Sequence, residues 1–271
     1  MTETFEVHSV GELVDATEYI RAERHLPLWY RGQRNAKWTV QPQLWRNGPT
    51  RPYTLADERN FTHRFRTRAA VRYPNTPAYD DHSGWLSLMQ HYGLPTRLLD
   101  WSRSPMVAAY FAVEAYLRPA DLEPEDAAIW VLSPHDLNRR LAGLDVTPAI
   151  NSGDCEHLVT PAFIDSPRTQ HRLRPGHVIA AMATELDLRM FVQQGCFTVH
   201  SPEADPLEDP SLSDGLLWRL RIPRASVGRF AWQMDSLGFR GGDLFPDLQN
   251  LASELTRSFP PGSVTAIKGQ R

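Results

Sequence analysis

Three polar segments of the sequence carry side chains that packing alone does not require. In the first, residues 29–33, Arg31 ends a short apolar run and Gly32 follows it. A guanidinium fork matches the oxygens of a phosphate or carboxylate, and a residue without a side chain leaves room for a ligand to approach the backbone. The alternative, which these residues taken alone favour, is a structural arginine that donates to loop carbonyls.

The second segment, residues 90–102, joins two expected helices. Functional groups concentrate in loops of this kind. It carries five candidate side chains, namely His91, Arg97, Asp100, Trp101 and Ser102. An ion pair between Arg97 and Asp100, or a helix cap at Asp100 or Ser102, explains only two residues at a time. The whole set therefore indicates a binding or catalytic loop.

The third segment, residues 189–198, begins with Arg189 and places Gln193 and Gln194 before a glycine and an expected strand. Two neighbouring amides at a strand entrance are suited to binding a ligand through hydrogen bonds. A turn with exposed glutamines is an equally good interpretation of these residues alone.

The elements that must position these segments follow from periodicity and capping signals. Helices are expected over residues 10–24, 54–73, 83–93, 105–117, 225–237 and 247–259. Extended segments are expected over residues 26–31, 38–44, 98–102, 127–132, 178–184, 196–200 and 216–222. Residues 134–175 show no clear period. The pattern predicts an α+β class with mainly antiparallel sheets and flanking helices, in one domain over residues 1–271 with a core of about 10–255 and a tail at 256–271.

Composition limits the function further. The 271 residues carry a net charge of −3, so the overall charge does not indicate binding to nucleic acid. Arginine supplies 27 of the 29 basic residues. The N-terminus lacks a signal-peptide pattern, the apolar stretch 98–117 is interrupted by charges, and Cys155 and Cys196 have no metal-ligand spacing. We expect a cytoplasmic protein with reduced thiols, no membrane association and no metal. P-loop, HExxH and GxSxG motifs do not occur.

Together the three segments resemble the FRG-domain family. The resemblance is carried by the motif Tyr30-Arg31-Gly32 and by the block from Gln90 to Trp101, QHYGLPTRLLDW. It extends over roughly residues 10–255. The family's activity is not well fixed, so this resemblance by itself implies little about the reaction.

A weaker resemblance, to ADP-ribosyltransferases of the Arg-Ser-Glu type, implies more. Those enzymes have an aromatic-Arg-Gly strand, then a Ser-Thr-Ser strand that leads into a helix, then a strand with a catalytic glutamate. The order here is the same, but residues 98–102 keep only one hydroxyl and Gln194 stands where a carboxylate is wanted. The resemblance implies an ADP-ribosyltransferase-like core and NAD as the substrate.

The resemblance also implies roles for individual residues. Arg31 would clamp the NAD pyrophosphate, Asp100 would supply the missing negative charge, and His91 would act as a base toward the acceptor. With Gln194 these form the expected catalytic set, and Arg31, Asp100 and Gln194 should line one cleft. Stacking of the nicotinamide would fall to Trp101 or Tyr30, and Ser102 would position the ribose. The residues expected to contact NAD are Tyr30, Gly32, Gln33, Arg97, Trp101, Ser102 and Arg189.

Three functions remain open from the sequence. The first is an NAD-consuming enzyme, an ADP-ribosyltransferase or NAD glycohydrolase of bacterial toxin or phage-defence type, with a protein, nucleic acid, small molecule or water as acceptor. The second is a ribonuclease or an RNA- or DNA-binding module, suggested by the basic row Arg59, His63, Arg64, Arg66, Arg68 and Arg72. Pairing of that row with Asp57 and Glu58 along the core edge would explain it without nucleic acid. The third is a non-catalytic regulatory or sensor module with an antitoxin or regulatory partner.

Overall fold

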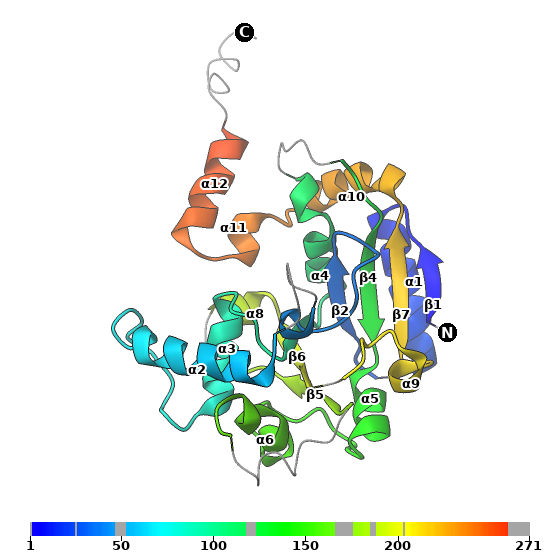
Figure 1. Cartoon of the computed structure of the whole chain (residues 1–271). Helices are drawn as coiled ribbons and strands as arrows, with labels where there is room; N and C mark the ends of the chain where they lie inside the picture. Colours follow the sequence, from blue (N-terminus) through cyan, green and yellow to red (C-terminus); the bar gives the residue numbers. More distant parts are fainter. Residues whose placement is uncertain are drawn as a thin grey trace, which may run out of the picture.

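The computed structural model describes residues 2–24, 26–46, 53–117, 123–165, 176–184, 188–202 and 204–259. Within these ranges seven strands form one mixed sheet in the order β1-β7-β4-β2-β3-β6-β5 (Figure 1). β1 and β7 are parallel and the other neighbouring pairs are antiparallel. The strands are β1 (Glu3–Glu6), β2 (Trp29–Gln33), β3 (Leu98–Ser102), β4 (Ala127–Leu132), β5 (Val178–Met182), β6 (Gly195–His200) and β7 (Leu217–Ile222). The predicted α+β class is confirmed.

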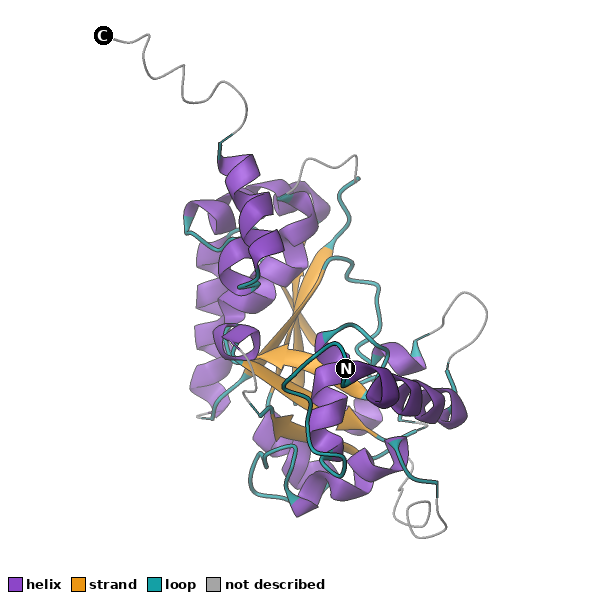
Figure 2. Cartoon of the chain, turned by 90° about the vertical axis from the view of Figure 1, so that its left-hand side faces the viewer, coloured by secondary structure: helices purple, strands orange, loops and turns teal. Residues whose placement is uncertain are grey.

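Helices lie on both sides of the strands (Figure 2). The longer ones are α1 (Val10–Arg24), α2 (Leu55–Ala69), α3 (His82–His91), α4 (Pro105–Val113), α10 (Arg224–Ser236) and α12 (Leu248–Ser258). Shorter helices are α5 (Pro134–Leu141), α6 (Gly153–Val159), α8 (Leu188–Val192), α9 (Pro210–Ser213) and α11 (Gly241–Leu244). None of the described helices is both long and apolar enough to cross a bilayer.

Local signals explain where α2 and α4 begin. Thr54 caps α2 in a capping box with Asp57, each side chain accepting from the other residue's backbone N–H. Ser104 caps α4 and Pro105 occupies its first position, where a missing N–H costs nothing. α4 is apolar nearly all round and buries most of its length, as expected from its composition.

The sheet has two halves that meet at a narrow junction. β2 pairs with β4 over five residues and β3 pairs with β6 over five residues, yet β2 and β3 share the single pair Tyr30–Ser102. We call this junction the seam. On one face, α1, α4 and α10 pack on the first half, whereas α3 and α6 pack on the β3-β6-β5 half. A third cluster, including Trp29, Trp101 and Trp130, spans the opposite face.

The fold corrects one expectation and contains elements that the sequence did not indicate. Residues 38–44 are not a strand but a loop that enters a short 3-10 helix, Gln43–Trp45. The segment 134–175 contains α5 and α6, which are too short to show a period, while residues 166–175 lie outside the described ranges. β1 was not expected, because four residues joined in parallel to a distant strand leave no local signal. Residues 260–271 of the predicted tail are also outside the described ranges.

Candidate functional site

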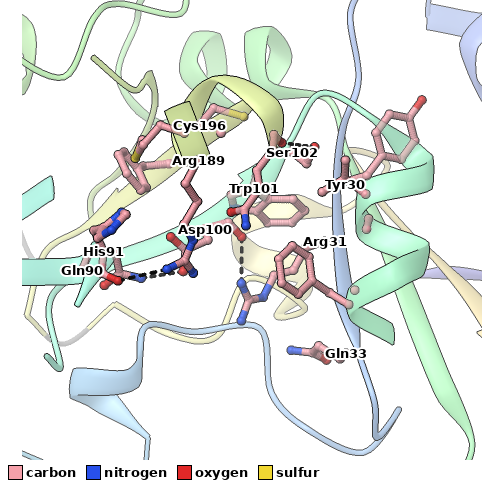
Figure 3. Close-up of a pocket in the computed structure, with 18 of the residues that line it drawn as sticks. Tyr30, Arg31, Gln33, Gln90, His91, Asp100, Trp101, Ser102, Arg189 and Cys196 are labelled. Atoms are coloured by element: carbon pink, nitrogen blue, oxygen red, sulfur yellow. Dashed lines mark hydrogen bonds between the residues drawn. The ribbon is translucent and has the colours of Figure 1, made fainter. Parts of the chain in front are cut away.

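A cavity of about 450 Å³ opens at the seam, with walls from both halves of the sheet (Figure 3). Its lining comes from β2 and the loop after it, from β3, from the second half of α3, from α4, and from α8 through the first residues of β6. A volume of this size suits a small organic ligand or part of a nucleotide. The three polar segments that are far apart in the sequence therefore meet around one space.

Arg31 crosses the seam. Its Nη1 donates to the main-chain oxygen of Asp100 at 2.7 Å, across the place where β2 and β3 no longer pair (Figure 3). Its Nε is buried and has no hydrogen-bond partner among the described residues. Burial lowers the pKa of Arg31 to about 10, while the charge of Asp100 opposes this shift. The guanidinium therefore stays charged at neutral pH and keeps hydrogen-bonding capacity for an anion.

Asp100 presents an exposed carboxylate at the same cavity. Its Oδ2 accepts from Gln90 Nε2 at 2.5 Å (Figure 3). Gln90 Oε1 in turn accepts from the Thr96 hydroxyl at 2.6 Å. Neither structural alternative applies: Ser104 rather than Asp100 caps α4, and Arg97 pairs with Glu58 instead of Asp100. Two hydrogen bonds in series orient the carboxylate, leaving its other oxygen for a ligand.

Cations outnumber anions in the lining. Arg31, Arg34, Arg46 and Arg189 face the carboxylates of Asp100 and Glu114, which gives four positive charges against two negative ones. Arg34 lies over the Trp38 ring at 5.2 Å, and Arg46 Nε donates to the Gln41 carbonyl at 3.0 Å. Such a surplus, partly buried, favours a ligand that carries negative charge.

Arg189 and His91 close the side of the cavity formed by α3 and α8. Arg189 Nη1 donates to the main-chain oxygen of His91 at 3.3 Å, and its guanidinium lies over the Phe245 ring at 4.6 Å. The His91 ring meets Tyr92 edge to face at 4.9 Å. Both residues line the cavity.

Several predicted ligand-binding groups line the cavity with their polar atoms already engaged. The Ser102 hydroxyl donates to the Gln193 carbonyl at 2.7 Å, and Gln33 accepts from the Trp130 indole N–H at 2.8 Å. The Trp101 indole N–H donates to the Thr198 hydroxyl at 3.0 Å, and its ring belongs to the core of the opposite face. Tyr30 is buried, which raises the pKa of its hydroxyl. Because their polar atoms are already hydrogen-bonded or buried within the protein, these groups mainly define the shape of the cavity.

The structure departs from the sequence prediction at two positions. Gln194 does not line the cavity; it is exposed in a left-handed turn with φ of 49°, and Gln193 lines the cavity in its place. Arg97 is also absent from the lining: it is fully buried, pairs with Glu58 through two nitrogens and donates to the Leu158 carbonyl at 2.5 Å. The expected cleft thus holds Arg31 and Asp100 without Gln194.

Gly32 lines the cavity, and helix α4 occupies the space that its missing side chain leaves. A Cβ at this position would lie 1.9 Å from the Ala108 carbonyl oxygen and 2.6 Å from the Ala112 nitrogen. The glycine therefore permits backbone-to-backbone packing of β2 on α4 at a position that also lines the cavity.

Three charged lining residues were missed by sequence reasoning. Arg34 follows Arg31 by three residues and was available as a signal, since it lies just past the end of the same strand. Arg46 comes from the loop after a 3-10 helix, and Glu114 begins the 3-10 helix after α4. Neither carries a local pattern that points to a cavity.

The fold and the cavity define an α+β protein with a seven-stranded mixed sheet and a basic cavity where that sheet narrows to one residue pair. Residues 27–121 match the family model of the FRG domain, and this part of the chain is an FRG domain. The match runs from β2 through α4 and is narrower than the range of about 10–255 that the motifs indicated. No curated protein and no solved structure matches the chain. The ADP-ribosyltransferase-like core stays a prediction.

Proposed function

We propose that this chain binds NAD in the cavity at the seam and breaks its nicotinamide–ribose bond, as an ADP-ribosyltransferase or NAD glycohydrolase. The observation that carries the proposal is the meeting of Arg31 and Asp100 at one cavity with a surplus of arginines. A dinucleotide has the complementary chemistry: two phosphates for the guanidinium groups and a ribose that becomes cationic during cleavage.

In this reaction the C1′–N bond breaks and its electron pair leaves with nicotinamide. Positive charge builds on the ribose, and a carboxylate stabilises such an oxocarbenium-like transition state. Asp100 replaces Gln194 in this role, because Asp100 lines the cavity with an oriented carboxylate whereas Gln194 does not. The acceptor oxygen or nitrogen then bonds to C1′ and loses its proton, for which His91 is the proposed base.

The proposal is tested by incubating the full chain with NAD and measuring free nicotinamide, with water alone and with protein and RNA added as acceptors. Asp100→Asn should lower the rate by about 100- to 1000-fold while NAD binding persists, since the group acts mainly on the transition state. Arg31→Lys keeps the charge but loses the planar fork, so it should weaken NAD binding. Arg139→Lys, at an exposed arginine paired with Asp145, is the matched control.

Two outcomes would contradict the proposal. One is the absence of both NAD binding and nicotinamide release in the folded wild-type protein with every acceptor. The other is wild-type release by Asp100→Asn and Arg31→Lys together. Circular dichroism and thermal melting of each variant separate a lost site from a lost fold.

A further inference from the structure

We infer that a second hollow, a groove between α2 and the last turn of α3, binds single-stranded nucleic acid. The groove encloses about 380 Å³ and shares no lining residue with the cavity at the seam. Seven of its ten lining residues are arginine or aromatic. Proteins that hold single strands combine these two residue types, because cations follow the phosphates and rings stack on the bases.

The arginines of the groove that form hydrogen bonds have neutral partners instead of acidic ones among the described residues; Arg64 Nε, for example, donates to Asn60 Oδ1 at 2.8 Å. Arg64, Arg68 and Arg72 are exposed, and none of the three forms an ion pair with another residue in the described part of the chain. Two other arginines of α2 are engaged inside the protein: Arg59 pairs with Asp165 at 3.1 Å, and Arg66 is buried with its guanidinium over the Tyr79 ring at 3.8 Å. The helix thus keeps its uncompensated charge on the side of the groove.

The acids expected to neutralise this row do not do so. Asp57 belongs to the capping box of α2, and Glu58 is buried in its ion pair with Arg97. The row remains cationic in a chain of net charge −3. The groove is thus locally positive in a chain whose net charge is negative, which gives the charge complementarity that a polyanion requires.

The spacing of the arginines matches a repeated anion. Arg64 and Arg68 are four residues apart on α2, which places them about 6 Å apart along the helix axis. Arg72 extends the row just beyond the helix, where its Nη1 donates to the Arg68 carbonyl at 2.8 Å. A lipid with a single charged head group would contact one or two of these three arginines. The successive phosphates of a nucleic-acid strand would contact all three.

Aromatic rings lie beside the row. Phe61 and Phe65 come from α2, and Tyr73 meets Tyr92 edge to face with ring centroids 6.2 Å apart. Tyr92 is 58% exposed, so its ring is accessible to a base. The other lining residues are Ala69, Leu88 and Leu94, so the floor offers few groups to read base edges and the binding should tolerate most sequences.

This inference stands apart from the proposed NAD chemistry, because binding is measured without NAD. The probe is a fluorescein-labelled 15-nucleotide strand, dT15 or U15, titrated with the full chain between 50 and 200 mM salt and followed by anisotropy. Three phosphate contacts predict a slope of log Kd against log salt of about 2, from about 0.7 per phosphate. The triple variant R64Q/R68Q/R72Q should lose that slope and the binding.

Two further variants make the test sharp. R21Q/R229Q/R257Q removes the same charge from exposed arginines outside the groove and should bind like the wild type. Tyr92→Ala should weaken binding by about 5- to 150-fold, the range for loss of one stacked base, with the salt slope unchanged. Thermal melting of every variant checks that the fold is intact.

The inference is overturned if neither strand binds the wild-type protein at 50 mM salt, or if R64Q/R68Q/R72Q binds as well as its matched control. It is also overturned if an acidic amphipathic peptide binds through the same three arginines while the strands do not, since the groove would then be a site for a partner helix. A blunt duplex that binds as tightly as the single strand would exclude stacking on Tyr92.

Discussion

His200 gives the clearest test of the electrostatics around the seam. It ends β6 with no exposed surface, and its Nε2 is hydrogen-bonded to the Thr198 hydroxyl at 2.8 Å. Its Nδ1 is buried without a hydrogen-bond partner among the described residues. Burial, with a smaller contribution from the charge of Arg31, lowers the pKa of His200 to about 3. The imidazole is therefore neutral in the folded protein at every pH in ordinary use.

The unfolded chain binds a proton at this histidine near its usual pKa of about 6.5, whereas the folded protein does not. Stability from this group is complete above the unfolded pKa and falls as the pH drops from about 6.5 toward 3. The linkage relation gives a loss of about 2 kcal/mol between pH 7.5 and pH 5. Any folded pKa below about 4 gives nearly the same figure at pH 5, because the folded state is then unprotonated there.

The measurement is urea unfolding of the wild type and of His200→Gln at pH 7.5 and pH 5. His200→Gln keeps a polar group near Thr198 but cannot titrate, so its free energy of unfolding should fall by about 2 kcal/mol less than that of the wild type. Equal pH dependence in the two proteins would refute the reasoning, and would mean that His200 is accessible to protons in the folded state. The baseline cost of the substitution cancels, because each protein is compared with itself.

Two other predictions concern packing at and near the seam. Gly32→Ala should destabilise the protein by more than the usual 1–3 kcal/mol of overpacking, since its Cβ would meet the backbone of α4 at Ala108, and thermal melting should show a large fall or no folded protein. Arg97→Met should cost about 3–5 kcal/mol by leaving Glu58 buried and unpaired, whereas Arg97→Met with Glu58→Met should recover much of that loss in urea unfolding. A double variant no more stable than the single one would contradict the second prediction.

Local patterns predicted the elements that surround the site well. Residues 10–24, 98–102 and 127–132 have the predicted boundaries, because capping residues and uniform apolar runs are properties of adjacent positions. The meeting of residues 29–33 with residues 98–102 was anticipated only through the resemblance in motif order. Neither segment alone indicates that β2 and β3 pair at a single position, Tyr30–Ser102, and then diverge.

Individual side-chain roles were harder to predict, because they depend on distant partners. Arg97 lies within the most distinctive motif, yet its role is set by Glu58, which is 39 residues away. Gln194 and Gln193 are adjacent and chemically identical, and only the left-handed turn at Gln194 decides which of them faces the cavity. The purpose of Gly32 is likewise set by α4, some 76 residues further along the chain.

The single residue pair at the seam also bears on whether the matched FRG segment can fold as an independent unit. The matched segment, residues 27–121, contributes β2 to one half of the sheet and β3 to the other, and completes neither half. β4 and β7 on one side, and β5 and β6 on the other, come from sequence beyond the match. In this chain the matched segment therefore contains the seam, its two strands and the helices α2, α3 and α4, and not a body that closes its own core. Excised alone, residues 27–121 would expose two sheet edges, so the matched boundaries are a poor guide to where the chain can be cut.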